Sequence, residues 1–345
     1  MTVPARTTDA AAATPGPDEA SVKEALRQVA ADTGFALKLA ANRIELPAAT
    51  PSNGPDPYGE HDPEWLRIDW RTARRQLDVV GARVNYVEMG EGPPLLFVHG
   101  LSGAWQNWLE NIPHFARSHR VIAMDLPGFG FSPMPSWQLT IPSYGRFLRD
   151  FCERVGVERC AIVGNSMGGF IATEVAVADP DRIEKLVLVS AAGITWARAR
   201  QEPAAMIGRV FRAAAPLALR FQTSAGIRRP RARQLAFNGV FHDPSALRRE
   251  LLWENIMPAL ESPGYLDALT NLVGYDIRHR LAEIEDPTLI VWGRNDRVVP
   301  VPAALSYQRR IGDKAELVIF DETGHMPQLE RPQRFNRLLE RFLAE

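Results

Sequence analysis

The stretch Gly164-Asn165-Ser166-Met167-Gly168 has the residue types and the spacing of a turn that carries a nucleophile. The apolar run Ala161–Val163 before it indicates a buried strand, and Gly168–Val177 after it has the composition of a helix. A sharp turn from strand to helix exposes a serine hydroxyl above a sheet, and it needs glycine on both sides because a Cβ there would clash with neighbouring backbone. We therefore expect Ser166 to act as a nucleophile.

A serine nucleophile needs a base, and the base needs an acid that orients it. Asp296 follows the apolar run Leu289–Trp292, and His325 follows the last such run, Leu317–Phe320. We predict that His325 takes the proton of Ser166 and that Asp296 fixes the tautomer of the imidazole. Three other acids are less well placed, one because it precedes a Pro-Gly turn and two because they lie too close to the histidine in sequence: Asp125, Asp321 and Glu322.

The oxyanion formed during attack on a carbonyl carbon needs backbone N–H donors. The N–H of Met167, directly after the serine, is the first expected donor. The second is expected from the loop His99–Gly103, with Leu101 as the preferred residue and Gly100 as its neighbour. We expect His99 itself to stabilise this turn rather than to act as a base.

Short apolar runs predict the strands that position these loops. Gln76–Val80 and Val84–Glu88 flank Gly81-Ala82-Arg83 and indicate an antiparallel hairpin. Helical patterns separate most of the later runs, which predicts an α/β fold with a mostly parallel eight-stranded sheet and helices on both faces. Those later runs are Leu95–Val98, Val121–Met124, Ala161–Val163, Leu186–Val189, Leu289–Trp292 and Leu317–Phe320.

The N-terminal quarter of the chain follows a different pattern. Residues 1–17 are rich in Ala, Thr and Pro and are predicted to be a disordered tail. Residues 18–75 are predicted to hold an amphipathic helix from Ser21 to about Asn42 and a Pro-rich linker over 47–63. The apolar stripe of that helix must be buried against the main domain or against a partner chain, so a homodimer stays open.

The interval 194–285 interrupts the alternation of strands and helices that runs through 76–193 and 286–345. It has helical patterns, at Ala204–Ala214, Pro244–Ile256 and Gly264–Val273, and no strand signal. We predict a helical cap above the carboxyl ends of the strands, where open α/β sheets bind their ligands. Its arginines favour a solvated cationic face, with peripheral contact to an anionic membrane as the alternative: Arg198, Arg200, Arg209, Arg212, Arg220, Arg228, Arg229, Arg231 and Arg233.

Composition bounds the class of protein. Hydrophobic residues make up 46% and charged residues 23% of the 345 positions, and the formal net charge of −1 argues against a nucleic-acid binder. Cys152 and Cys160 fall on a predicted helix and at a predicted strand start, which indicates buried free thiols in a reducing compartment. The first residues lack the features of a secretion signal, and no apolar run reaches ~18 residues. We expect a soluble, cytoplasmic protein without a metal or organic cofactor.

Two further motifs accompany the serine turn and the His-Gly loop at His99. Asp125–Ser132 fits D-x-P-G-x-G-x-S, and Gly324–Pro332 fits G-H-x-x-x-x-E-x-P. With these motifs the chain resembles the α/β-hydrolase fold superfamily from about Val79 to Leu343. The similar branch contains carboxylesterases, monoacylglycerol-lipase-like enzymes, meta-cleavage-product C–C hydrolases, epoxide hydrolases, haloalkane dehalogenases and cofactor-free haloperoxidases.

The resemblance implies a serine hydrolase that cleaves carboxylic esters of a mainly apolar acyl group through an acyl-enzyme. Dehalogenases and epoxide hydrolases use an aspartate where this chain has Ser166. C–C hydrolases share the G-N-S-M-G-G stretch but usually carry Gly-Pro-Gly where this chain has Leu101-Ser102-Gly103. C–C cleavage with the same triad and a slow or non-catalytic binding role remain the alternatives. Trp105, Trp108 and Gly100 are expected at the substrate pocket, with core packing as the alternative for both tryptophans.

Overall fold

The computed structural model describes residues 46–59, 62–194, 229–260 and 262–345. The predicted disordered tail 1–17, the predicted helix from Ser21 to about Asn42 and the helical pattern Ala204–Ala214 lie outside these residues. Most of the arginine-rich stretch lies outside them as well, and only its end from Arg229 onward is described.

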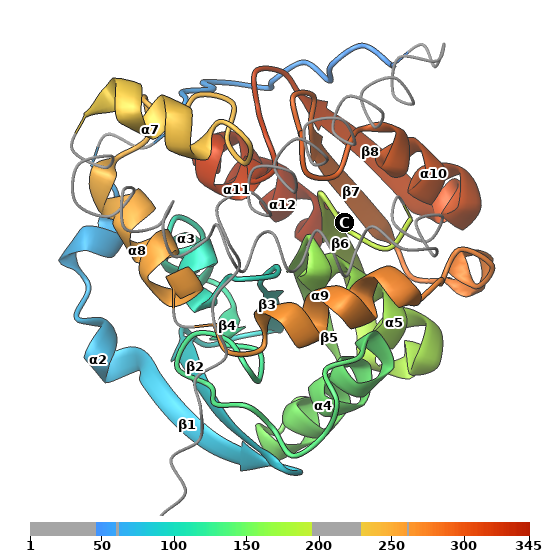
Figure 1. Ribbon diagram of the computed structural model, residues 1–345. Coiled ribbons are helices and arrows are strands. Elements are labelled where there is room, and N and C mark those ends of the chain that lie inside the picture. The colour runs from blue at the N-terminus through green and yellow to red at the C-terminus, as the bar shows by residue number, and fades with distance from the viewer. Residues whose placement is uncertain (1–45, 60–61, 195–228, 261) are drawn as a thin grey trace, which may run out of the picture.

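A sheet of eight strands forms the centre of the molecule (Figure 1). Its order is β1-β2-β4-β3-β5-β6-β7-β8. The six strands from β3 to β8 pair in parallel, whereas the hairpin strand β2 pairs antiparallel with both β1 and β4. This confirms the predicted mostly parallel sheet. The strands are β1 (Arg74–Val79), β2 (Ala82–Met89), β3 (Pro94–Val98), β4 (Arg120–Met124), β5 (Cys160–Asn165), β6 (Ile183–Val189), β7 (Thr288–Gly293) and β8 (Ala315–Phe320).

Helices follow most of the parallel strands, as the alternation of patterns predicted. The α-helices are α2 (Trp70–Ala73), α3 (Ile112–Phe115), α4 (Ile141–Arg154), α5 (Met167–Ala178), α7 (Pro230–Phe237), α8 (Arg249–Leu260), α9 (Tyr265–Gly274), α10 (Pro302–Ile311), α11 (Pro327–Glu330) and α12 (Pro332–Ala344). Short 3₁₀ helices are η1 (Glu64–Arg67), η2 (Trp105–Trp108), η3 (Pro180–Arg182), η6 (Leu281–Glu283) and η7 (Gly312–Lys314).

Both faces of the sheet are covered by helices. Alternate residues of each strand point to opposite sides, so a strand can contribute to two core clusters. Leu96 and Val98 of β3 belong to a core cluster with residues of α4, α5 and α10, whereas Leu95 and Phe97 belong to a second cluster with residues of η2, α3 and α12. Cys152 of α4 and Cys160 of β5 are buried and free, as predicted for the two thiols, while the reducing compartment stays a prediction. The central strands are therefore held rigidly from both sides, and the loops at their carboxyl ends start from fixed positions.

The segment between β6 and β7 is helical in its described part, with α7, α8 and α9. The segment, hereafter the insert, is joined to the core where Gly264 N donates to Gly128 O (2.9 Å) and where Asn107 Nδ2 donates to Asn255 Oδ1 (2.6 Å). A cap over the whole site stays a prediction. Among the described residues, no helix has both the length and the apolar character needed to cross a bilayer.

Residues 46–59 and 62–73, hereafter the strap, run along the outside of the core from β8 to β1 (Figure 1). The strap starts with mutual hydrogen bonds between Thr50 and Ile319 of the edge strand β8. Further on, Arg334 Nη1 donates to Asp56 Oδ2 (3.1 Å), and Trp65 Nε1 donates to Glu110 Oε1 (2.8 Å). The Pro-rich segment predicted as a linker is thus extended along the core and bonded to it.

Candidate active site

Ser166 stands at the turn between β5 and α5, in a backbone conformation that few residues adopt. Its φ of 55° and ψ of −116° lie in a region that is strained for a residue with a side chain. A Cβ on Gly164 would clash with Gly168 O, and a Cβ on Gly168 would clash with Val98 O. The glycines therefore let β3, β5 and α5 approach closely enough to form the turn, for the reason expected from the sequence.

Asp296 and His325 follow β7 and β8 and are joined by a hydrogen bond. His325 Nδ1 donates to Asp296 Oδ2 (2.8 Å), and the two side chains are 8% and 0% exposed. The other carboxylate oxygen of Asp296 accepts from Val298 N (2.8 Å) and Val299 N (2.9 Å). Because Nδ1 carries the proton toward the carboxylate, Nε2 of a neutral His325 is left as a proton acceptor.

The loop of His325 is also joined to the residue before the serine. Asn165 Nδ2 donates to Val189 O (3.1 Å) and to His325 O (3.3 Å). Among the residues that the structure describes, the Ser166 hydroxyl makes no hydrogen bond, so its link to His325 Nε2 belongs to the proposal below. Of the rival acids, Asp321 is bonded to Arg294 and Glu322 to Arg331, and neither orients the imidazole.

The loop after β3 lies against the serine. A Cβ on Gly100 would be 3.0 Å from Ser166 Cβ, and Gly103 N donates to Gly100 O (3.0 Å) in a tight turn. The amides of Leu101 and Met167 donate no hydrogen bond within the described part of the chain. Met167 is the first residue of α5, where a backbone N–H has no partner in its own helix. The role of these two amides as oxyanion donors stays a prediction.

His99 and Asp125 hold this loop by its backbone. His99 Nδ1 donates to Gly100 O (2.7 Å), and Leu126 N donates to His99 Nε2 (2.8 Å). Burial lowers the pKa of His99 to about 4, so the ring stays neutral and serves as the structural residue that the sequence predicted. Asp125 accepts from Trp105 N, Asn85 Nδ2 and Phe131 N, while burial raises its pKa to about 6.

Glu330 holds the loop of His325 in the same manner, and sequence reasoning assigned it no role. Its side chain is fully buried and accepts from Gly324 N (2.9 Å) and Met326 N (3.2 Å), the amides on either side of the histidine. It also accepts from His242 N (2.7 Å) of the insert and from Tyr58 Oη (2.7 Å) of the strap. The G-H-x-x-x-x-E-x-P motif contains Glu330, so the motif was the available signal.

Comparison with known proteins assigns the chain to a family. A family model described as the alpha/beta hydrolase fold matches residues 93–332. The chain belongs to that family. It is 32% identical, over 78% of this chain and 94% of the relative, to a 2-hydroxy-6-oxo-6-phenylhexa-2,4-dienoate hydrolase of Comamonas testosteroni.

Two solved structures of hydrolases are similar in fold and sequence. One is a bacterial membrane phospholipase A, 27% identical, with a TM-score of 0.62 over 79% of this chain and 85% of that one. The other is a mutant of a meta-cleavage product hydrolase, 27% identical, with a TM-score of 0.61 over 78% of this chain and 97% of that one. The proteins similar to this α/β-hydrolase thus include a dienoate hydrolase, a meta-cleavage product hydrolase and a phospholipase A.

The two tryptophans expected at the substrate pocket of this family member are buried in the core. Trp108 is fully buried and stacks on Phe97, with ring centroids 4.7 Å apart. Trp105 is 4% exposed and packs against Trp70 of the strap at 5.0 Å. These positions favour core packing, and contact with a substrate stays a prediction for both.

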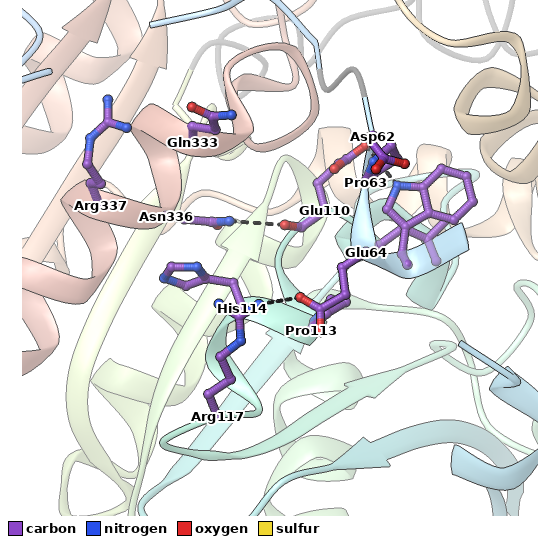
Figure 2. A pocket seen from close by; sticks show the side chains of 12 residues that line it. Asp62, Pro63, Glu64, Glu110, Pro113, His114, Arg117, Gln333, Asn336 and Arg337 are labelled. Carbon is purple, nitrogen blue, oxygen red and sulfur yellow. Dashed lines mark hydrogen bonds and ion pairs between the residues drawn. The ribbon is translucent and has the colours of Figure 1, made fainter. Parts of the chain in front are cut away.

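A surface pocket of about 320 Å³ lies away from the serine, between the strap and α12 (Figure 2). Its wall mixes acidic with basic side chains, among them Glu64, Glu110, Arg117 and Arg337. It contains none of the residues of the serine, aspartate or histidine loops, so it is no part of the candidate active site. The described residues also contain no cluster of His, Cys, Asp and Glu suited to a metal ion.

Proposed function

We propose that this α/β-hydrolase is a serine hydrolase that cleaves carboxylic esters through an acyl-enzyme on Ser166. The observation that carries the proposal is the 2.8 Å hydrogen bond from His325 Nδ1 to Asp296, in a loop that Asn165, the residue before a serine held at φ 55°, joins by its hydrogen bond to His325 O (3.3 Å). The bond fixes which imidazole nitrogen accepts a proton, and a strained turn of this kind exposes the serine hydroxyl above the sheet, where the proposal has that nitrogen accept its proton.

The chemical steps follow from these positions. His325 Nε2 takes the proton of Ser166 as its oxygen attacks the ester carbon, and the amides of Leu101 and Met167 stabilise the oxyanion. The imidazolium then gives its proton to the leaving alkoxide, and the C–O bond breaks. A water molecule, deprotonated by the same nitrogen, then attacks the acyl carbon, and the bond to Ser166 Oγ breaks as that oxygen takes the proton back from the imidazolium, which frees the acid. Asp296, buried and bonded to two amides, stabilises the imidazolium throughout.

Hydrolysis of a C–C bond in a dienoate is the second candidate, and the 32% identity to a dienoate hydrolase is the observation that favours it. The loop Leu101-Ser102-Gly103 supports the ester, because it lacks the Gly-Pro-Gly usual in the C–C enzymes that this chain resembles. The similarity to a structure named as a phospholipase A also supports an ester with an apolar acyl group.

Covalent labelling tests the nucleophile first. A fluorophosphonate probe is expected to label the wild-type protein and the Ser306→Ala variant, which removes an α10 serine outside the serine, aspartate and histidine loops, whose hydroxyl accepts from Arg310 Nε. Ser166→Ala should lose both the label and turnover, with a fall in kcat on the order of 10⁶, as is typical when a triad nucleophile is removed. Wild-type protein that takes no label and turns over no substrate would instead support the binding role.

A substrate panel then separates the two reactions. We expect p-nitrophenyl esters of increasing acyl length to be cleaved with a kcat/KM well above that for ring-cleavage dienoates. The reverse order would replace ester hydrolysis by C–C hydrolysis and leave the roles of Ser166, His325 and Asp296 unchanged. The acyl-length profile also reports the size of the pocket.

A further inference from the structure

Three segments that are far apart in sequence meet at the carboxylate of Glu330. Two of its hydrogen-bond donors, Gly324 N and Met326 N, are the amides on either side of His325. A third, His242 N, belongs to the insert. The hydroxyl of Tyr58, in the strap, is the side-chain donor. The backbone of the histidine loop is therefore positioned by a residue that itself depends on the strap and the insert.

The hydroxyl of Tyr58 bridges two of these segments. It donates to Glu330 Oε2 (2.7 Å) and accepts from Asp243 N of the insert (2.8 Å). Burial and the adjacent Glu330 carboxylate raise the pKa of Tyr58, so the hydroxyl keeps its proton and remains a donor. The Arg331 guanidinium lies 4.9 Å from the Tyr58 ring centroid, and Gly59 N donates to Glu330 O (2.8 Å). The tyrosine is thus fixed by its ring, by its hydroxyl and by the next residue.

The insert and the histidine loop are also bonded to each other directly. His325 N donates to Val240 O (2.7 Å), and a Cβ on Gly324 would clash with the backbone of the insert at Val240 O and His242 N. The loop and the insert therefore pack backbone against backbone, and small displacements of one are transmitted to the other. A 1 Å displacement of a catalytic group is enough to reduce turnover substantially.

We propose that Tyr58 is a positioning residue for His325, acting through Glu330 and the Asp243 amide to lock the histidine loop against the insert. Tyr58 lies outside residues 93–332, which match the family, so this role belongs to the strap of this chain. The inference rests on the proposed function of His325 as the base. Its test therefore includes one measurement that does not need catalysis.

Tyr58→Phe removes the hydroxyl and keeps the ring against Arg331. Thr50→Val is the matched control, because it removes one strap hydrogen bond, from Ile319 N to Thr50 Oγ1 (3.2 Å), that reaches the sheet edge and not the histidine loop. With a p-nitrophenyl ester, we expect Tyr58→Phe to lower kcat by about tenfold and to change KM by less than about twofold. Thr50→Val should keep both constants, although it also weakens the strap.

Hydrogen exchange of the peptide 321–330 gives the second measurement. Gly324 and Met326 should exchange about tenfold faster in Tyr58→Phe than in wild type, and at the wild-type rate in Thr50→Val. An active wild type whose kcat is unaffected by Tyr58→Phe would overturn the proposal, as would equal losses of kcat in the two variants. If wild type neither cleaves esters nor labels at Ser166, the proposed function fails, and exchange alone then decides whether Tyr58 positions the loop.

Discussion

The loops that carry Ser166 and His325 both lie at the carboxyl ends of the parallel strands but are held there by different means. The serine turn is fixed by packing, because each glycine that flanks it is in contact with neighbouring backbone. The histidine loop is fixed by hydrogen bonds to the buried carboxylate of Glu330, and the oxyanion loop by those to Asp125. The steric constraint is visible in the sequence as two glycines that flank the serine, although one of them packs against Val98 of β3, whereas a buried acceptor collects donors that leave no such mark.

The largest effect is expected from the carboxylate that acts on the imidazole itself. In Asp296→Asn the amide oxygen can still accept from Val298 N and Val299 N, so the loop after β7 keeps its shape. The amide NH₂ group, however, faces His325 Nδ1 and favours the wrong tautomer. We expect kcat to fall by about 10⁴, the size typical of this change in a triad, with little loss of stability.

Steady-state kinetics and urea denaturation of the same preparation check both halves of this prediction. Asp296→Glu is a useful companion, because it keeps the charge while moving the carboxylate. A much lower urea midpoint of unfolding for Asp296→Asn than for wild type would mean that Asp296 mainly holds its loop. Its role would then be the same as that of Glu330 and Asp125.

The steric side of the comparison is tested by Gly168→Ala. The added methyl group would clash with Val98 O and His99 O, which belong to β3 and the start of the oxyanion loop. We expect a loss of about 3 kcal/mol in the free energy of unfolding, at the upper end of the usual range for overpacking, together with a loss of labelling at Ser166.

Gly239→Ala is the control, since an added Cβ at Gly239 meets no atom within 4 Å. It should leave the free energy of unfolding within about 0.5 kcal/mol of wild type, the usual range for surface substitutions. Equal stability of the two variants would show that β3 and α5 can move apart at the turn, and packing would then not be what fixes the serine.

The same distinction explains which parts of the fold and of the site could be predicted from the sequence. The strands of the sheet and the serine turn could be predicted because each is indicated by a pattern of a few consecutive residues. The strands are indicated by apolar runs, and the turn by the glycines two residues before and after Ser166. Asp296 and His325 were predicted as a pair from their places after two strands, and the structure brings them within 2.8 Å. Each of these signals lies within a few residues of the element it predicts.

The roles of Glu330 and Tyr58 could not be predicted in this way. Tyr58 and Glu330 are 272 residues apart, and the strap between Pro47 and Pro63 has no periodicity that would indicate what it packs against. Its partners include arginines on α12, such as Arg334, which sequence alone shows only as part of an amphipathic helix. Burial of Trp105 against Trp70 depends on the same contact between strap and core.

The smallest expected effect concerns pH, and it distinguishes a loop held by a carboxylate from one held by packing. Burial raises the pKa of Asp125 from 3.8 to about 6, so the folded state binds its proton more tightly than the unfolded state. The contribution of this group to stability is therefore complete below about pH 4 and is lost as the pH rises through about 6. The difference between the two pKa values corresponds to roughly 3 kcal/mol at most.

Comparison of wild type with Asp125→Asn isolates this contribution, because every other titrating group is common to both proteins. Asparagine also places an NH₂ group toward Asn85 and Phe131 N, but that cost does not change with pH. Urea denaturation should therefore show the advantage of wild type over the variant to be smaller at pH 7 than at pH 4, by roughly 2–3 kcal/mol. If the stability advantage of wild type instead grows with pH, the three hydrogen bonds stabilise the charged carboxylate by more than burial destabilises it. The charged carboxylate would then be the form that holds the oxyanion loop.

The serine turn contains no titrating group of this kind. Gly168→Ala should therefore lower the free energy of unfolding by the same amount at pH 4 and at pH 7.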